Sequence, residues 1–250
     1  MAVQIRGLAK RFGQVVAVAG VDLDVRRGSF FGLVGPNGAG KTTSLAMVTG
    51  LLRPDSGAAR VDGIDVWERP LLARTRMGVL PEGLRLFERL SGRELLTFTG
   101  RLRAMDLAEI EQRSGQLLDV LGLAGAGDQL VVDYSTGMRK KIALAAAMLH
   151  NPPVLFLDEP FEAVDPVSAR TIRDVLRAFT QRGGTVVFSS HVMELVERLC
   201  DEVAIMAAGR VLAGGPIEQV RGGRPLEEVF VELVGGGTTV TSELDWLGQA

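Results

Sequence analysis

A glycine-rich stretch, GPNGAGKTT at residues 35–43, has the residue types that bind nucleotide phosphates. It fits the spacing G-x-x-x-x-G-K-[ST], in which glycines let backbone N–H groups turn toward an anion. Lys41 would reach the β- and γ-phosphates, and the Thr42 hydroxyl would ligate Mg²⁺. The residues expected to contact ATP or GTP are Gly35, Pro36, Asn37, Gly38, Ala39, Gly40, Lys41, Thr42 and Thr43.

Acids and a histidine follow two other apolar segments of the chain. Asp158 and Glu159 come directly after VLFL at residues 154–157, which is typical of a central parallel strand with a ligand at its carboxyl end. Asp158 would hold the metal, and Glu159 would position and deprotonate an attacking water. His191 follows TVVFSS at residues 185–190 and could contact the γ-phosphate, although an isolated histidine is more often structural.

The segments on either side of the phosphate loop must position it. FFGLV at residues 30–34 predicts a buried parallel strand. TTSLAMVTGLL follows at residues 42–52 and places Leu45, Val48 and Leu52 on one face of a predicted helix. The N-terminus of that helix would point its partial positive charge at the phosphates.

The rest of the chain predicts an α/β core interrupted by helices. VDLDV at residues 21–25 alternates apolar and acidic residues, which indicates antiparallel sheet near the N-terminus. Ser91 and Glu94 form a capping box, and Ser135 precedes a long helical pattern that ends near His150, expected to face the negative end of the helix dipole. We therefore expect an α/β core at 3–84 and 151–215, a helical lobe at 85–150, a small helical appendage at 216–234 and a flexible tail at 235–250.

Composition excludes several classes of protein. The net charge of −2 lacks the electrostatic footprint of a nucleic-acid binder. Cys200 is the only cysteine, so neither a disulfide framework nor a cysteine zinc site is expected. No apolar run reaches the roughly 18 residues of a membrane span, and the first ten residues carry no secretory signal. We therefore expect the chain to remain in the cytoplasm.

Taken together, the motifs resemble those of an ABC-transporter ATP-binding subunit. The phosphate loop, helical lobe, YSTGM, LFLDEP, VDP and SSH follow one another in that order, and the resemblance runs from about residue 3 to residue 234. It implies an α/β fold with a RecA-like P-loop NTPase core, an N-terminal antiparallel β subdomain and an inserted helical lobe. It also implies that Phe12, which alone is equally consistent with core packing, stacks on the adenine of ATP, and that Glu159 and His191 are catalytic.

The family's signature segment, usually LSGGQ, looks like residues 134–138 of this chain. The signature residues expected to act on the ATP of a partner subunit are Ser135, Thr136, Gly137 and Met138. Asp165 looks like the family's D-loop aspartate. Thr136 and Met138 replace a glycine and a glutamine of the usual signature, and residues 161–163 also depart from the family's pattern.

A third departure concerns the metal site. Glu82, after Leu80 and Pro81, occupies the position of the family's Q-loop glutamine, and its carboxylate would add charge near Mg²⁺. The expected metal ligands are Thr42, Asp158 and Glu82. These departures leave hydrolysis possible but put its rate in question.

The segment PLEEVFVEL at residues 225–233 resembles the tail of the exporter class that carries drugs, antibiotics or lipids. The resemblance implies a separate six-helix permease, a location at the cytoplasmic face of the membrane, and a second ATP-binding subunit, expected to be a copy of this chain. No nucleic-acid partner is expected.

Two alternatives stay open at this point. One is an ABC-type ATPase acting on nucleic acid, against which the acidic balance and the lack of a long coiled-coil insertion argue. The other is a non-hydrolysing regulatory or assembly protein, suggested by Glu82 and Thr136.

Overall fold

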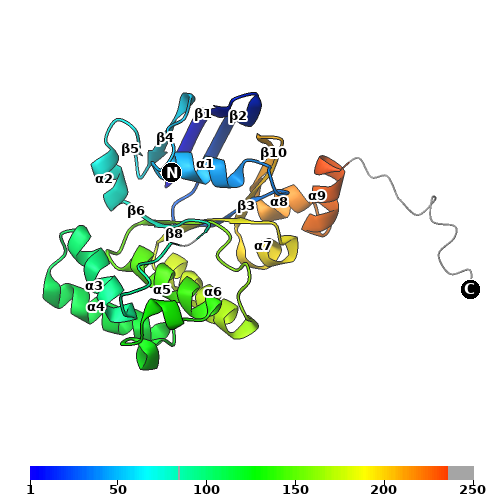
Figure 1. Cartoon of the computed structure of the whole chain (residues 1–250). Helices are drawn as coiled ribbons and strands as arrows, with labels where there is room; N and C mark the ends of the chain where they lie inside the picture. The colour runs from blue at the N-terminus through cyan, green and yellow to red at the C-terminus, as the bar shows by residue number, and fades with distance from the viewer. Residues whose placement is uncertain (84, 236–250) are drawn as a thin grey trace, which may run out of the picture.

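A computed structural model describes residues 1–83 and 85–235 of the chain. Apart from Gly235, the tail expected at 235–250 lies outside the described residues. The described residues form two sheets with helices packed around them (Figure 1). None of the helices in this part of the chain is long and apolar enough to cross a membrane.

A six-stranded sheet forms the centre of the molecule, with strand order β10-β9-β3-β8-β7-β6. All neighbouring strands are parallel except β10, which pairs antiparallel with β9. The strands are β3 (Phe30–Val34), β6 (Met77–Leu80), β7 (Val154–Leu157), β8 (Thr185–Ser190), β9 (Glu202–Ala207) and β10 (Arg210–Pro216). Every residue of β3, β7 and β8 is buried, which explains the continuous apolar sequences of β3 and β7 and the apolar centre of β8. The strands expected at 30–34 and 154–157 are confirmed.

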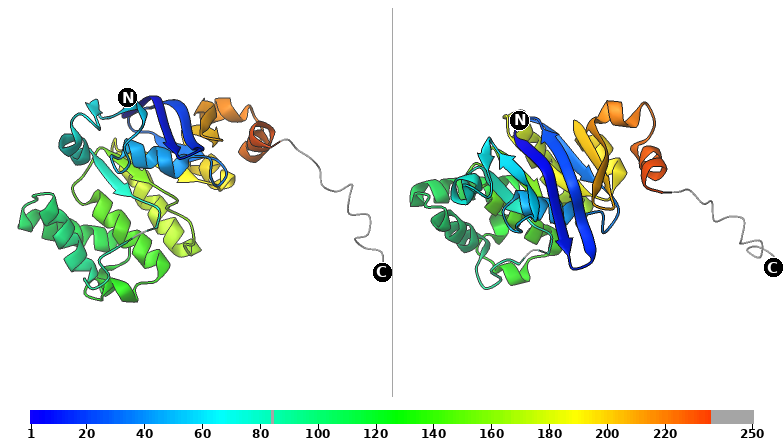
Figure 2. Two further views of the ribbon diagram at one scale, coloured as in Figure 1. Left: turned by 45° about the horizontal axis from the view of Figure 1, so that its top comes forward. Right: turned by 90° about the horizontal axis from the view of Figure 1, so that it is seen from above.

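An antiparallel sheet of order β2-β1-β4-β5 lies over one face of the central sheet (Figure 2). Its strands are β1 (Val3–Phe12), β2 (Val15–Val25), β4 (Ser56–Val61) and β5 (Ile64–Asp65). Apolar residues of this sheet and of the central sheet join those of α1 (Lys41–Val48) in one hydrophobic cluster, which includes Leu8, Met47 and Phe156. The helix that follows the phosphate loop is thereby held between the two sheets.

Most other helices cover the opposite face of the central sheet (Figure 1). They are α3 (Gly92–Leu102), α4 (Leu107–Val120), α5 (Thr136–Met148), α6 (Pro166–Gln181) and α7 (Met193–Leu199), with short 3₁₀ turns η1 (Ala124–Ala126) and η2 (Val131–Asp133). Ser91 and Glu94 form the predicted capping box of α3, and Ser135 caps α5 as predicted. α8 (Ile217–Arg221) and α9 (Leu226–Val234) lie at the other end of the molecule from α3 and α4. The short helix α2 (Pro70–Thr75) was not expected from the sequence.

The helix after the phosphate loop is shorter than its apolar pattern predicts. α1 ends at Val48, because Gly50 adopts a left-handed conformation with φ +75°. The N–H groups of Leu51 and Leu52 both donate to the carbonyl of Ala46, at 2.9 and 3.0 Å, and thus satisfy the end of the helix. Leu52 still packs partly against the core, so the pattern identified a partly buried residue but assigned it to the wrong element.

His150 follows the C-terminal end of α5, as the sequence predicted, but its ring packs against β6. Its Nε2 lies 3.1 Å from the carbonyl oxygen of Met77 in β6, and the ring is partly buried. Burial lowers the pKa of His150 to about 4, and the charges of Arg103 and Arg113 act in the same direction. His150 is therefore a neutral packing residue at neutral pH.

This neutral histidine makes stability depend on pH. Because the folded-state pKa of about 4 lies below the ordinary histidine pKa of 6.5, the unfolded chain binds more protons and stability falls as pH drops from 6.5 toward 4. We expect the free energy of unfolding of wild type to fall between pH 7 and pH 5 by about 1–2 kcal/mol more than that of His150→Gln, allowing for solvent screening. Urea unfolding at both pH values measures this difference, and equal pH dependences would contradict it.

Candidate phosphate and hydrolysis site

The phosphate loop joins β3 to the N-terminus of α1, where close packing requires glycine. A Cβ atom at Gly35 would lie 2.3 Å from the carbonyl oxygen of Met206. Gly40, the N-cap of α1, has φ +99°, and a Cβ there would lie 2.4 Å from the carbonyl oxygen of Ala17. No side chain caps this helix start, so its first N–H groups face the loop and suit a phosphate.

Lys41 is buried, with 6% of the side chain exposed, and its ammonium is aimed into the loop. Nζ donates hydrogen bonds to the carbonyl oxygens of Gly35 at 2.7 Å and Pro36 at 3.2 Å. It also lies 3.9 Å from Oε1 of Glu159. A buried ammonium needs anionic or carbonyl partners, and phosphate oxygens are partners of the same kind.

The three expected metal ligands come from the start of α1 and from the ends of β6 and β7. The Thr42 hydroxyl donates to Oε2 of Glu82, just after β6, at 3.2 Å. Asp158, after β7, is buried and accepts a hydrogen bond from the Ser189 hydroxyl through Oδ1. Burial raises the pKa of Asp158, whereas hydrogen bonds from Ser189 and Thr42 lower it.

These residues form a donor set that fits Mg²⁺. A small cavity of about 80 Å³ is lined in part by Thr42, Glu82 and Asp158. Within residues 1–83 and 85–235, no group of three or more acidic, histidine or cysteine side chains could hold a metal ion. Two carboxylates and a hydroxyl are a set that Mg²⁺ takes together with phosphate oxygens and waters.

Glu159 has the surroundings of a held carboxylate. It is 8% exposed, its Oε1 lies 3.9 Å from Nζ of Lys41, and its Oε2 lies 3.2 Å from Nδ1 of His191. Its N–H donates to the Ser189 hydroxyl at 2.9 Å. Its φ of +45° lies in the left-handed region, which is strained for a residue with a side chain.

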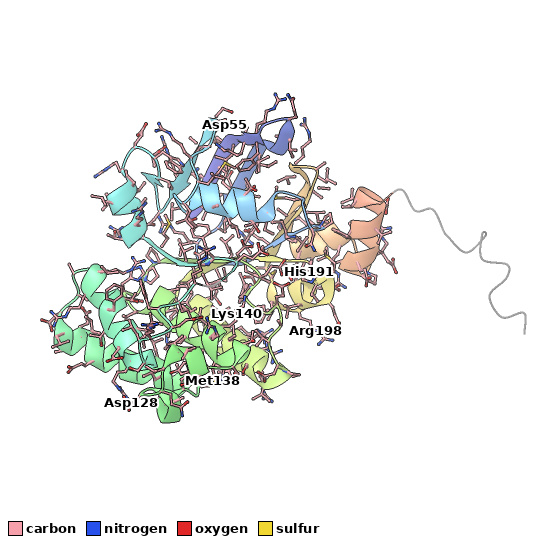
Figure 3. All side chains as sticks on the ribbon, viewed as in Figure 1. Asp55, Asp128, Met138, Lys140, His191 and Arg198 are labelled. Carbon is pink, nitrogen blue, oxygen red and sulfur yellow. The ribbon has the colours of Figure 1, made fainter. Side chains whose placement is uncertain are left out.

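The signature residues lie at the start of α5, away from the phosphate loop. Ser135 accepts a hydrogen bond from the N–H of Met138 at 3.3 Å, and Thr136 is exposed. Asp165 caps α6 by accepting from the N–H groups of residues 167 and 168. Among the described residues, no hydrogen bond or ion pair joins 135–138 to the phosphate loop, and Figure 3 shows Met138 well apart from His191.

Phe12 ends β1 and is 50% exposed, so the alternative that it belongs to the core is wrong. The ammonium of Lys10 lies 5.7 Å from the centre of its ring. An exposed aromatic ring can stack on a base, and adenine stacking by Phe12 stays a prediction.

Sequence reasoning missed two residues that contact Glu159. Ser189 bridges Asp158 and Glu159 through its hydroxyl. The ammonium of Lys140 in α5, labelled in Figure 3, donates to the carbonyl oxygen of Glu159 at 2.8 Å. Ser189 could have been suspected from the polar end of its strand, whereas no sequence signal pointed to Lys140.

A parallel sheet with a glycine loop at one strand end and acids at the neighbouring ends defines a P-loop nucleotide hydrolase. Residues 18–162 match the family described as ABC transporter. The chain is 39% identical over 220 residues to the daunorubicin/doxorubicin resistance ATP-binding protein DrrA of Streptomyces peucetius, with 88% of this chain and 67% of that protein covered. It is 38% identical over 212 residues to the Nod factor export ATP-binding protein I of Cupriavidus metallidurans, with 85% and 70% covered.

A solved structure described as the ATP binding subunit of an ABC transporter superposes on the chain with a TM-score of 0.87. It shares 29% sequence identity and covers 93% of this chain and 99% of that one. The chain therefore belongs to the ABC transporter family and is an ATP-binding, ATP-hydrolysing subunit. The predicted P-loop NTPase fold and the resemblance to exporter-class subunits are confirmed.

Proposed function

We propose that this chain powers the export of a drug, antibiotic or lipid through a separate six-helix permease, from the cytoplasmic face of the membrane. The names of the relatives support the class of cargo. The observation that carries the ATPase part is the meeting of Lys41, Thr42, Asp158 and Glu159 at the carboxyl ends of β3 and β7. The proposal includes an α/β core at 3–84 and 151–215, a helical lobe at 85–150 and an appendage at 216–234.

In this proposal each side chain has a stated task. Lys41 binds the β- and γ-phosphates, and Phe12 stacks on adenine. The oxygen of a water bonds to the γ-phosphorus while Glu159 takes a proton from that water, and the bond from the γ-phosphorus to the leaving phosphate oxygen breaks. His191 orients the Glu159 carboxylate, 3.2 Å away, and contacts the γ-phosphate. Thr42, Asp158 and Glu82 hold Mg²⁺, which when bound neutralises phosphate charge.

Two copies of the chain close head to tail over two ATP molecules. The start of α5, with Ser135, Thr136, Gly137 and Met138, would then face the γ-phosphate held by the partner copy, where helix N–H groups favour an anion. Asp165 lies beside this helix start, since a Cβ on Gly137 would come within 2.7 Å of Oδ2 of Asp165. ATP binds better to the closed pair, so its binding drives the permease and its hydrolysis resets it.

Nothing in the described part of the structure favours an ATPase acting on nucleic acid or a non-hydrolysing protein over the proposed transport function. The nucleic-acid ATPase is still opposed by the net charge of −2. A non-hydrolysing role is opposed by the buried carboxylate of Glu159, held between Lys41 and His191. DNA-stimulated ATPase activity would support the first alternative, and lack of turnover with the permease present would support the second.

The shared-site arrangement predicts complementation between two defective variants. Thr136→Glu places a negative charge at the exposed first residue of α5, where the partner's γ-phosphate would lie. Lys41→Ala removes the phosphate cation. Neither variant alone should form dimers with a non-hydrolysable ATP analogue. An equal mixture should form them, because one of its two composite sites combines an intact Lys41 with an intact signature.

Native mass spectrometry would count subunits and nucleotides in the mixture, with one intact site expected per mixed dimer. Ala108→Glu, which adds the same charge at the exposed start of α4, is the matched control and should dimerise like wild type. A substitution at Gly137 is avoided, since a Cβ there would lie 2.6 Å from Oγ of Ser168. A mixture that stays monomeric while wild type dimerises would overturn the shared site.

A further inference from the structure

Helix α5 contacts the segment between β7 and α6 at two points one helical turn apart. At Gly137 the helix packs so closely that an added Cβ would lie 2.6 Å from Oγ of Ser168 and 2.7 Å from Oδ2 of Asp165. At Lys140 the ammonium donates to the main-chain carbonyl of Glu159 at 2.8 Å. Residues three apart share one face of a helix, so this face of α5 spans both ends of the 159–165 segment.

The contact at Lys140 falls on a strained peptide. Glu159 has φ +45°, and such a conformation persists only when its surroundings hold it. On its N-terminal side, the N–H donates to the Ser189 hydroxyl at 2.9 Å. On its C-terminal side, the carbonyl accepts from the N–H of Glu162 at 3.3 Å and from the ammonium of Lys140 at 2.8 Å. The shorter, charge-assisted bond from Lys140 is the stronger of the two.

Four carboxylates act on the charge of Lys140. Burial lowers the pKa of Lys140, and the charges of Glu162, Asp158, Glu159 and Glu82 oppose that shift. Lys140 is partly buried, so its ammonium is held near these acids and is not free in solvent. Removing it would leave the Glu159 carbonyl with only the longer bond and leave the acids without this counter-charge.

We propose that Lys140 is a positioning residue for ATP hydrolysis. It holds the Glu159 peptide, and through it the carboxylate, in place between Lys41 and His191. Because Gly137 and Lys140 lie on the same helix face, the position of the helical lobe is transmitted to the hydrolytic carboxylate of the same subunit. The inference rests on the proposed roles of Glu159 and of the α5 start.

The test compares Lys140→Met, Lys140→Arg and Lys141→Met. Methionine keeps the aliphatic stem and removes the charge, and arginine restores a donor. Lys141→Met makes the same change one residue further on, where the ammonium lies by Gly122 and not by Glu159. For Lys140→Met we expect kcat for ATP to fall about tenfold to a hundredfold with KM within about twofold, as for a misplaced catalytic group. Lys140→Arg should recover most of the loss, and Lys141→Met should turn over like wild type.

A double-mutant cycle separates positioning from general stability. If Lys140 acts through Glu159, adding Lys140→Met to Glu159→Gln should slow single-turnover hydrolysis no further. The inference would be overturned if the rate decrease of the double variant equals the product of the two single-variant decreases. A Lys140→Met variant with wild-type kcat would also overturn it.

Hydrogen exchange provides a readout that needs no ATPase activity. In the nucleotide-free protein, amide exchange of residues 158–165 should be faster in Lys140→Met than in wild type and in Lys141→Met. Unchanged exchange there would overturn the inference. If wild type shows no ATP turnover that requires Lys41, the proposed function is overturned instead. Failure of the inference and failure of the proposed function are therefore distinguishable.

Discussion

Glu159→Gln is expected to bind ATP as tightly as wild type and to hydrolyse it about 10²–10⁴-fold more slowly. Glutamine has nearly the same shape as glutamate but cannot take a proton from water. The ammonium of Lys41 stays in the loop, hydrogen-bonded to Gly35 and Pro36, so phosphate binding is retained. Because the closed pair then keeps its ATP, ATP-bound dimers should accumulate.

Single-turnover hydrolysis of radiolabelled ATP measures the rate, and size exclusion detects the trapped dimers. Glu194→Gln is the matched control, since this exposed glutamate on α7 pairs with Arg198 and does not touch the site. Turnover of Glu159→Gln near the wild-type rate would show that another group takes the proton. Glu82, hydrogen-bonded to the Thr42 hydroxyl, would then be the carboxylate to test.

Lys41→Ala is expected to weaken ATP binding roughly 30-fold to several thousandfold, the equivalent of about 2–5 kcal/mol for removing one partner of a buried charge pair. The side chain is 6% exposed and points at the carbonyl side of the loop. No other lysine replaces it, because Lys140 is bonded to the Glu159 carbonyl.

Titration calorimetry with ATP measures the loss, and circular dichroism shows whether the variant is folded. Arg182→Ala, which removes an exposed cation at the end of α6, should bind ATP like wild type. If folded Lys41→Ala binds ATP with unchanged affinity, the assignment of the phosphate loop is wrong.

Much of the fold was predictable because its signals are local. The glycine loop, the apolar runs of β3 and β7 and the caps at Ser91 and Ser135 each depend on residues within a few positions of one another. Buried parallel strands favour continuous apolar sequence, and serine is a preferred residue at the start of a helix. Elements specified by such local patterns form in the folded protein where the sequence predicts them, so the order of strands, loop and helices could be inferred.

Local patterns were misleading where distant contacts decide. Leu52 fits the apolar face of a helix, but the chain turns at Gly50 with φ +75° before reaching it. His150 follows a helix, but packing against Met77, 73 positions earlier in the chain, keeps it neutral. Burial and partner charges set a pKa, and neither can be obtained from neighbouring residues in the sequence.

The sequence by itself determined which side chains could bind phosphate, metal and water, because residue type and short spacing specify that chemistry. Only the tertiary structure decided how they are held. It placed the Ser189 hydroxyl between Asp158 and the N–H of Glu159, and the Lys140 ammonium on the Glu159 carbonyl. It also packed Gly137 against Asp165. These contacts join residues from 19 to 31 positions apart, and they exist because parallel strands bring their carboxyl ends to one edge and a helix from another part of the chain packs across it.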